Sequence, residues 1–278
     1  MSISYKVISQ KPIIFNRLVG IKVKDFEVVL EKLTPLWEKK VLSAYKRPGR
    51  NFKLSLAEML MMLLIYYRSY ITHEFLGYLF SIDDSRVCRL IKRLEPLLAR
   101  IVAIRKERHL SQEEVENLII DATEQPIERP KKGQKKYYSG KKKRHTVKTE
   151  IRITPQGRIV HVSRHLPGSV HDFAVYKCGP PVHRDTRAFV DSGYQGLDKL
   201  HQATEIPYKK SRNHKLDKEE KEYNAGLSRL RVKVENILCN IKVFRVLSDR
   251  YRNKRKGYSL KFNIVAGIVN LKNGFAIA

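Results

Sequence analysis

The sequence predicts an α/β protein in which an all-helical domain precedes a mixed sheet flanked by helices. Two observations support this class. Between residues 54 and 98, apolar residues recur at helical spacing, and each such segment follows a residue that can cap a helix. After residue 110, short apolar runs of β-forming residues alternate with turns. A chain of 278 residues with 42% hydrophobic residues can bury one large core or two smaller ones. We place the boundary near residue 108, which gives domains at residues 1–108 and 109–278.

The net charge of +28 and the pI near 10.0 are the strongest global features of the chain. So much charge of one sign repels itself unless a polyanion is bound, so DNA or RNA is the expected partner. An anionic membrane is the alternative. However, the chain has no run of 18 apolar residues and no recognisable signal peptide, and its most apolar stretch, Met59 to Tyr67, is too short to span a bilayer.

The three cysteines, Cys88, Cys178 and Cys239, are far apart and odd in number. Their spacing matches neither a zinc site nor a disulfide framework. We expect each to be a small buried hydrophobic residue, and we expect the protein in the reducing cytoplasm.

Two helix starts are well marked in the N-terminal domain. Ser55 to Glu58 form a capping box, which introduces a helix expected over residues 56–68. This helix is apolar nearly all round, so we expect it to be buried. Thr72 introduces a shorter helix over residues 73–80.

A third helix is expected over residues 86 to about 95, capped by Asp84 or Ser85 and ended or kinked by Pro96. Two helices joined by a turn of three or four residues match a helix-turn-helix unit, which we place at about residues 54–98. The alternative is an ordinary helical bundle with a basic exposed face. In the helix-turn-helix interpretation the third helix offers four basic side chains to DNA, namely Arg86, Arg89, Lys92 and Arg93.

Two apolar runs in the second domain each lead into an aspartate. Residues 118–120 precede Asp121, and residues 188–190 precede Asp191. Short runs of this kind fit buried strands, so each acid is expected at a strand end, where it faces a cleft.

Residues 129–148 form a basic loop that contains Tyr137 and Tyr138 and no acid. Basic residues with interleaved aromatics suit a phosphate backbone and unstacked bases. The alternative is a solvated charge run, but the loop begins within ten residues of Asp121. We therefore expect contact with DNA, most clearly from the cluster Lys141, Lys142, Lys143 and Arg144.

A hairpin is expected next, with strands over residues 146–154 and 158–166 and a turn at 155–157. A helix over about residues 168–177 follows. A hairpin and then a helix, after an acid-tipped strand, is the opening of an RNase H-like fold.

A long helix is expected over residues 215–249, with a break near residues 224–226. At about 100° per residue, Arg231, Glu235 and Lys242 fall together at the edge of its apolar stripe. A surface ion pair between Arg231 and Glu235 is the plain alternative. A last helix over residues 258–273 is expected to pack on the sheet.

Asp121, Asp191 and Glu235 form the ligand set that a two-magnesium phosphoryl-transfer site needs. Magnesium prefers carboxylate oxygens and keeps several waters. A pair of such ions can hold both the attacking and the leaving oxygen of an in-line displacement.

Taken together, these motifs resemble the DDE transposases of bacterial insertion sequences, in the group related to eukaryotic Harbinger elements. The resemblance covers about residues 110–273 and, more loosely, the helix-turn-helix. Its departure is Ser228, where many relatives in other groups have a tyrosine. The matching motifs are residues 120–124, 168–172, 191–196, Asn224 with residues 227–229, residues 231–236, and Lys242.

The resemblance implies that Asp121, Asp191 and Glu235 are the catalytic, metal-holding triad and that Arg231 and Lys242 contact the element end. It also implies that His171 and Asp172 shape the site. We therefore expect a metal-dependent transposase that binds double-stranded terminal repeats and target DNA, uses Mg²⁺ or Mn²⁺ as two ions, and acts as a homodimer or larger assembly in the bacterial nucleoid. The alternatives are an endonuclease without strand transfer and an inactive DNA-binding regulator.

Overall fold

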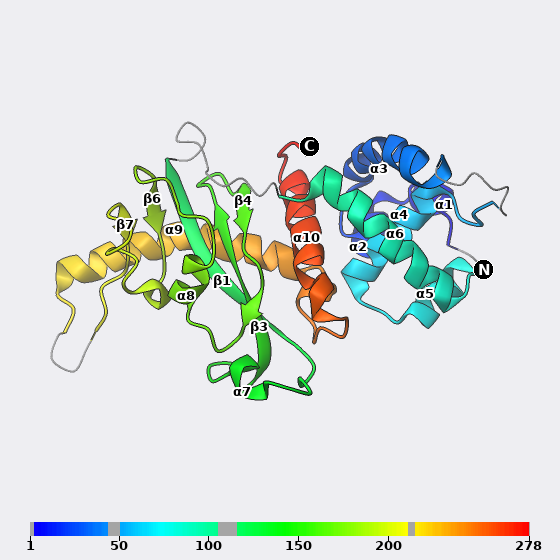
Figure 1. The fold of residues 1–278 in the computed structure, drawn as a ribbon. Helices are drawn as coiled ribbons and strands as arrows, with labels where there is room; N and C mark the ends of the chain where they lie inside the picture. Colours follow the sequence, from blue (N-terminus) through cyan, green and yellow to red (C-terminus); the bar gives the residue numbers. More distant parts are fainter. Residues whose placement is uncertain (1–2, 44–50, 105–115, 211–214, 278) are drawn as a thin grey trace. The chain divides into compact units, whose positions relative to one another are not determined.

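The computed structural model describes residues 3–43, 51–104, 116–210 and 215–277, and the chain divides into two compact units (Figure 1). The helical unit comprises Met1–Ala103, Ile241–Asp249 and Leu260–Ala278. The sheet unit comprises Ile104–Asn240 and Arg250–Ser259. The predicted boundary near residue 108 lies outside the described residues.

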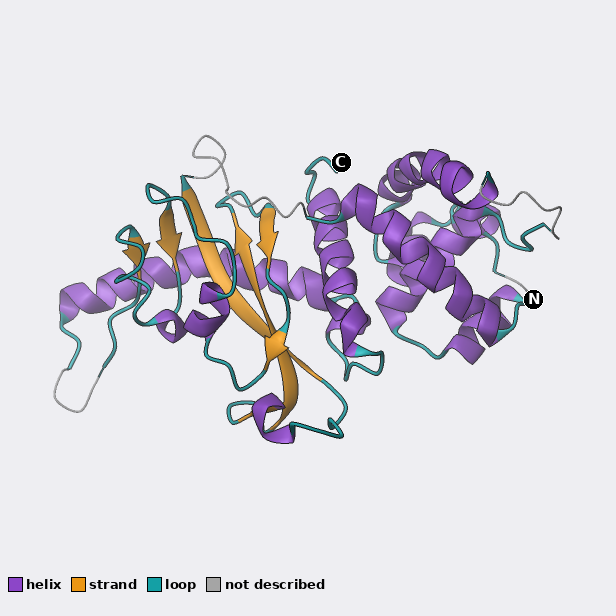
Figure 2. Ribbon diagram, viewed as in Figure 1, coloured by secondary structure: helices purple, strands orange, loops and turns teal. Residues whose placement is uncertain are grey.

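The helical unit is built from short and medium helices (Figure 2), and its buried side chains are mostly apolar. Its longest members are α3, α4 and α6, and nine consecutive residues of α4, Met59 to Tyr67, are buried. Helix α4 is therefore the central helix, as its all-round apolar sequence predicts. Besides the C-terminal helix described below, the elements are α1 (Tyr5–Ile8), α2 (Pro12–Val19), α3 (Val23–Trp37), η1 (Glu38–Leu42), α4 (Leu56–Ser69), α5 (His73–Phe80), α6 (Asp84–Val102) and η3 (Arg245–Leu247).

The predicted starts of α4 and α5 are confirmed. The Ser55 hydroxyl accepts a hydrogen bond from the Glu58 amide at 3.2 Å, and the Ser55 amide donates to the Glu58 carboxylate at 2.9 Å. Thr72 accepts from the Phe75 amide in the same way at 3.2 Å. These contacts satisfy backbone donors that a helix N-terminus leaves unpaired.

The predicted cap of the third helix and its predicted end near Glu95 were wrong, whereas a kink at Pro96 stays a prediction. Its N-cap is Asp83, whose carboxylate accepts from the Arg86 amide at 2.9 Å. Helix α6 also continues through Pro96 to Val102. Proline removes one helical hydrogen bond, but the buried Leu94 and Leu98 keep both sides of the site packed in the core.

The C-terminal helix α10 (Tyr258–Lys272) belongs, from Leu260 onward, to the helical unit and not to the sheet, contrary to expectation. The Lys261 ammonium lies 2.9 Å from the Glu95 carboxylate, which also accepts a hydrogen bond from the Tyr67 hydroxyl at 2.9 Å. Glu95 and Lys261 are both buried. This ion pair ties α10 to α6 through charges that the apolar pattern of the sequence does not reveal.

Replacing Lys261 by Met is expected to destabilise the protein by about 3–5 kcal/mol, because it leaves the Glu95 carboxylate buried without its cation. Chemical denaturation measures the loss. The double change Glu95→Leu with Lys261→Met should cost less than the single one, since no unpaired charge remains. Lys24→Met, at an exposed position of the same unit, is the control. A loss below about 1 kcal/mol for Lys261→Met would contradict this account of the ion pair.

The sheet unit contains a mixed sheet with strand order β2-β3-β1-β6-β7, in which β4 and β5 also pair with β3. Strand β1 is antiparallel to β3 and parallel to β6, and β6 is parallel to β7. The predicted hairpin is confirmed by the β3–β4 pairing. The strands are β1 (Asn117–Pro126), β2 (Tyr138–Ser139), β3 (Arg144–Ile153), β4 (Ile159–Val162), β5 (Leu166–Pro167), β6 (Arg187–Phe189) and β7 (Thr204–Glu205).

Helix α9 (Lys218–Lys242) crosses one face of this sheet (Figure 1). The predicted break near residues 224–226 is wrong. Gly226 faces open space, so its missing side chain leaves no packing defect. The Asn224 side chain exchanges hydrogen bonds with the Tyr208 backbone and anchors this turn of the helix. The other helices of the unit are α7 (Gln134–Tyr137), α8 (Asp172–Lys177), η2 (Ser192–Tyr194) and η4 (Arg255–Gly257).

The apolar residues that precede Asp121 and Asp191 form the core beside these two strands. Leu118 and Ile120 of β1 pack with Ala188 and Val190, and Tyr194 closes the cluster. All five are fully buried. The predicted architecture, a helical region followed by a mixed sheet with helices, is confirmed, and it agrees with an RNase H-like domain.

Two expectations about apolar character had different outcomes. Cys178 and Cys239 are exposed and Cys88 is half-buried, so the prediction of buried cysteines was wrong. Within the part of the chain that the structure describes, none of the helices has the length and hydropathy needed to cross a bilayer.

Candidate active site

Asp121 and Asp191 are brought together by the parallel pairing of β1 with β6. The last paired residues are Ile119 and Phe189. Asp121 and Asp191 each come two residues later in the sequence than these paired residues. A step of two residues returns to the same face of a sheet, so the two aspartates lie on one face. The prediction that β1 ends at Asp121 was wrong, because pairing with β3 continues as far as Pro126. Asp121 instead lies within β1, just beyond the last residue of β1 that pairs with β6.

The pKa of the Asp121 carboxyl is shifted by its burial and by the charged groups around it. Burial raises its pKa from 3.8 to about 6. The positive charge of Arg231 and a hydrogen bond from the Ala122 amide at 2.8 Å act in the opposite direction. The negative charges of Asp191 and Asp172 also raise the pKa, and the value of about 6 includes all of these effects. Asp172, Asp191 and Arg231 therefore lie near enough to Asp121 for their charges to act on its carboxyl.

A raised carboxyl pKa means that the ionised form is disfavoured in the folded state. Below about pH 4 Asp121 is protonated in both folded and unfolded chains, and above about pH 6 the folded chain carries the full cost. Asp121→Asn removes that charge. We expect the metal-free variant to melt roughly 2–4 °C higher than the parent at pH 8 and at the same temperature at pH 4. Calorimetry at the two pH values checks this, and a lower melting temperature at pH 8 would contradict it.

Asp191 is held by its own turn. Its carboxylate accepts a hydrogen bond from the Gly193 amide at 2.7 Å and caps η2. A Cβ at position 193 would lie 2.5 Å from an oxygen of Asp172 and 2.9 Å from one of Asp191. A side chain at position 193 would therefore displace these two carboxylates from their present positions. The Arg231 guanidinium lies 3.9 Å from the Asp191 carboxylate.

Asp172 is paired with Lys148, which sequence reasoning placed in the DNA-contacting loop. Lys148 is buried, and its ammonium lies 2.8 Å from the Asp172 carboxylate and 3.5 Å from that of Glu124. Lys148 and Glu124 face each other across β1 and β3. The β-alternation of residues 146–154 could have separated Lys148 from the loop. The adjacent His171 is exposed at the N-cap of α8.

Glu235 is not brought into this cluster. It is exposed on α9 and does not contribute to the pKa shift of Asp121. No group of three His, Cys, Asp or Glu side chains among the described residues lies close enough to hold a metal ion. Glu235 does follow Arg231 by four residues, so the two share one face of the helix. The ion pair that Arg231 forms is with Asp191, which disfavours the plain surface pair with Glu235.

A second, buried polar network lies near these carboxylates. The sequence did not reveal it. The Glu150 carboxylate accepts hydrogen bonds from Arg152 at 2.9 Å and from the Tyr194 hydroxyl at 3.4 Å. Glu150 and Arg152 are almost completely buried. Burial raises the pKa of Glu150, and burial together with the nearby acids raises that of Tyr194. The Tyr194 ring thus connects this network to Asp121, Asp172 and Asp191.

The donors at the end of β6 fit a divalent cation. Carboxylate oxygens are the ligands that Mg²⁺ and Mn²⁺ prefer, and Mg²⁺ commonly uses one or two carboxylates and keeps its waters. The mutual repulsion of Asp121, Asp172 and Asp191 would be relieved by a bound cation. The carboxylates of Asp121 and Asp191 are the best placed, because that of Asp172 already has Lys148 as its cation.

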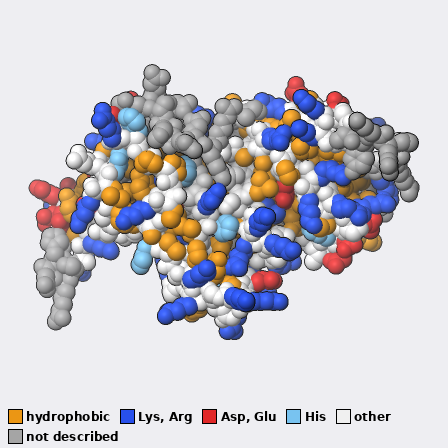
Figure 3. Space-filling model, in the orientation of Figure 1, with side chains coloured by type: hydrophobic (Ala, Val, Ile, Leu, Met, Phe, Trp, Pro, Cys, Tyr) orange, Lys and Arg blue, Asp and Glu red, His pale blue; other side chains and the backbone are white. Residues whose placement is uncertain are grey.

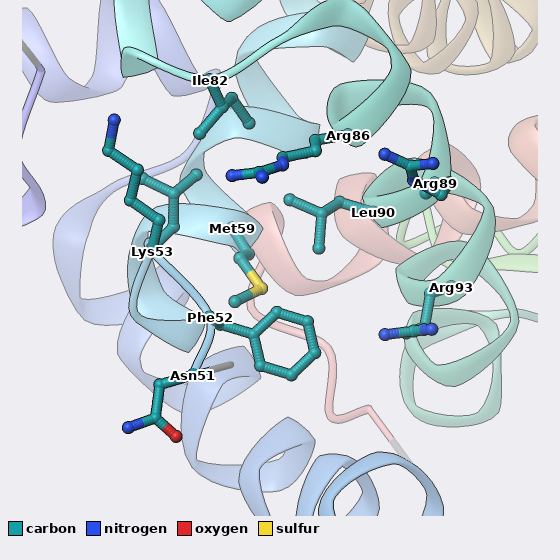
Figure 4. Close-up of a pocket in the computed structure, with 10 residues that line it drawn as sticks. Asn51, Phe52, Lys53, Met59, Ile82, Arg86, Arg89, Leu90 and Arg93 are labelled. Atoms are coloured by element: carbon teal, nitrogen blue, oxygen red, sulfur yellow. The ribbon is translucent and has the colours of Figure 1, made fainter. Parts of the chain in front are cut away.

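The basic face of α6 borders a groove of about 260 Å³ in the helical unit (Figure 4). The apolar floor of the groove is formed by Phe52, Met59 and Leu90. The side chains of Arg86, Arg89 and Arg93 line it as well. Arg86 lies 3.0 Å from the Asp83 cap, and Arg93 lies over the Phe52 ring. Arg86, Arg89 and Lys92 are exposed and Arg93 is half-buried. All four predicted DNA contacts are therefore available on one helix.

The predicted basic cluster of residues 141–144 is also at the surface. Lys141, Lys142 and Lys143 are exposed in the turn that leads into β3, and Arg144, the first residue of β3, is exposed as well. Basic side chains gather at this end of the sheet unit, around α7 (Figure 3). Lys242, at the end of α9, is exposed too.

Comparison with known proteins decides the family. Residues 120–271, more than half of the chain, match the family described as DDE superfamily endonuclease. This chain belongs to that family. The match begins at the β1 residue before Asp121 and includes Asp191 and Glu235. Residues 52–102 of this DDE superfamily endonuclease match the helix-turn-helix that accompanies the family, which confirms that prediction.

Curated relatives of this DDE superfamily endonuclease are insertion-sequence proteins. One from Microchaete diplosiphon, named as the probable transposase for insertion sequence element IS702, is 36% identical over 92% of this chain and 93% of its own length. Another from Streptomyces albus G, named as the putative transposase for insertion sequence element IS112, is 25% identical over 73% of this chain and 75% of its own length. No solved structure matches the chain.

Proposed function

We propose that this endonuclease is the transposase of an insertion sequence, which cuts DNA at the ends of its element and joins the ends to a target. The observation that carries the proposal is the convergence of Asp121, Asp191 and Arg231 at the end of β6. The names of its relatives support the same conclusion.

In this proposal Asp121 and Asp191, completed by Glu235 from α9, hold divalent metal, Mg²⁺ or Mn²⁺, as two ions. The bound metal would lower the pKa of the attacking water and stabilise the leaving 3′-oxygen. Asp121 supports this role because a carboxyl with a pKa of about 6 is ionised at pH 7–8 and gains from a neighbouring cation.

Arg231 is the proposed contact for the phosphate that reacts. Its side chain is 21% exposed, so part of its guanidinium is accessible to a ligand. Its guanidinium is already oriented toward Asp191. A guanidinium matches the geometry of phosphate oxygens and donates charge-assisted hydrogen bonds to them. Asp172 and Lys148 are proposed to hold α8 and the Asp191 turn in place.

The reaction needs no covalent protein nucleophile. In the first step a water oxygen bonds to phosphorus at the element end, and the bond between phosphorus and the 3′-oxygen breaks to release a 3′-hydroxyl. In the second step that hydroxyl attacks a phosphodiester of the target and displaces its 3′-oxygen. Positioning and electrostatics supply most of the catalysis of such transfers.

The helix-turn-helix is proposed to bind the terminal repeats through Arg86, Arg89, Lys92 and Arg93, and the cluster at residues 141–144 and Lys242 to bind backbone phosphates. Phosphate contacts give affinity that falls steeply with salt, while base contacts give specificity. Cutting two ends in one event favours a homodimer or a larger assembly on DNA.

The test uses DNA that carries the element's own ends, incubated with protein and Mg²⁺ or Mn²⁺. The transposase proposal expects nicks at the ends and, with pre-cleaved ends, joining to a target plasmid. Cutting without joining would indicate an endonuclease that lacks strand transfer. Specific binding with neither reaction would indicate a DNA-binding regulator.

A further inference from the structure

A groove lined by positive charge lies in the sheet unit, outside the carboxylate cluster. Residues 127–131 form one wall and residues 251–256 the other, and the groove has a volume of about 570 Å³. One lining residue, Glu128, is acidic. Six are basic: Arg129, Lys131, Arg252, Lys254, Arg255 and Lys256.

The two walls are joined by backbone contacts. Ile127 and Tyr251 form a parallel bridge, and the Tyr251 amide donates to the Pro126 carbonyl at 2.8 Å. The Arg255 guanidinium lies 4.3 Å from the centre of the Tyr137 ring, which connects this wall to α7. The positive charges are therefore held close together by the fold, at a cost in repulsion that a bound polyanion would offset.

The lining favours a phosphodiester backbone over a small anion or an apolar ligand. Lys131, Arg252, Lys254 and Lys256 are exposed, whereas the apolar members Ile127, Pro130 and Tyr251 are buried and offer little surface to a ligand. Charges spaced along two walls match a polymer that carries regularly spaced phosphates. Such contacts position DNA without reading its sequence.

The position of the groove relative to Asp121 follows from the strand. Ile127 comes directly after β1 and six residues after Asp121. At 3.3 Å per residue the groove begins roughly 20 Å from the carboxylate, or less if the strand bends. DNA rises 3.4 Å per base pair, so this distance corresponds to about six base pairs.

We propose that this groove binds the backbone of duplex DNA without sequence preference, about six base pairs from the phosphodiester that reacts at Asp121. The six-base-pair placement rests on the proposed function. The binding itself does not, since it depends only on the charges of the groove. Besides the cluster at residues 141–144, the groove adds a further contact with DNA in the unit that carries the catalytic carboxylates.

The test compares two triple variants of the full-length protein. Lys131→Gln, Lys254→Gln and Lys256→Gln remove three exposed charges from the groove. Lys199→Gln, Lys218→Gln and Lys221→Gln remove three exposed charges elsewhere in the same unit and are the matched control. Affinity for a random-sequence duplex of about 30 base pairs is measured without divalent metal between roughly 50 and 300 mM salt.

We expect the groove variant to bind at least tenfold more weakly near 0.1 M salt, with a salt slope reduced by about two to three, because each lost phosphate contact removes about 0.9. The control should change the slope by less than about one. Equal changes in the two variants would overturn the proposal, since net charge and not the groove would then govern binding. Thermal melting confirms that both variants fold.

A second measurement tests the placement. Uncleaved element ends are trimmed on either side of the reactive bond, without divalent metal, and wild-type affinity is expected to fall once fewer than about six base pairs remain on one side. The groove variant should be insensitive to that trimming. Failure of the transposase proposal has a different signature: wild-type protein that shows the groove-dependent salt slope but never cuts or joins DNA.

Discussion

Replacing Asp191 by Asn is expected to reduce cleavage at the element ends by about 10³-fold or more while DNA binding stays within about twofold of the parent. Asparagine keeps the shape of the side chain but removes the charge that would hold a metal ion. Metal assistance to phosphoryl transfer is worth several kcal/mol, and each 1.36 kcal/mol is tenfold in rate. Asp121→Asn is expected to have the same effect.

Single-turnover cleavage with Mg²⁺ measures the loss, and a gel-shift titration measures binding. Asp198→Asn is the matched control, because Asp198 is an exposed aspartate of the same unit seven residues further on. The control should cleave at the parent rate. Cleavage by Asp191→Asn within about tenfold of the parent would remove Asp191 from the metal site. A parallel loss of binding would indicate a folding defect instead.

The elements that sequence predicts well are those whose signals are local. The capping box at Ser55 and the Thr72 cap are short-range hydrogen bonds, so they appear in the structure at the predicted residues. The two strands that lead to Asp121 and Asp191 are also local patterns of apolar β-formers. Their meeting in space was predicted from the need of a metal site, and the parallel register of β1 with β6 supplies its structural cause.

The features that sequence missed depend on tertiary contacts. Lys148 reads as one more cation in a basic run, and its burial against Asp172 requires the fold of α8 beside β3. Glu95 and Lys261 are 166 residues apart, so nothing local indicates that α10 joins the helical unit. Helix α9 runs unbroken past Gly226, where propensity alone favours a break. In each case packing decided against the local preference.

Sequence and structure point to different residues for the third carboxylate of the metal site. A pair of variants distinguishes the two candidates. The motif order assigns Glu235, whereas the structure brings Asp172 close to Asp121 and Asp191. Two observations favour Glu235. Its helix delivers Arg231 to Asp191, and Asp172 is already neutralised by Lys148 at 2.8 Å.

We therefore expect Glu235→Gln to lose about 10³-fold or more in cleavage, as Asp191→Asn does, and Asp172→Asn to lose about tenfold through a loosened Asp191 turn. Replacing Mg²⁺ with Mn²⁺, which binds nitrogen and oxygen ligands more tolerantly, should partly restore Glu235→Gln and leave Asp172→Asn unchanged. Glu222→Gln, at an exposed position of the same helix, is the control.

The opposite outcome has an equally definite structural meaning. If Glu235→Gln cleaves at the parent rate and Asp172→Asn is inactive, the metal site consists of Asp121, Asp172 and Asp191, and Lys148 must give up its ion pair when metal binds. That switch would raise the apparent metal affinity of a Lys148→Met variant. Titration of metal binding in the Lys148→Met and parent proteins would then distinguish a displaced lysine from one that holds Asp172 in place throughout the reaction.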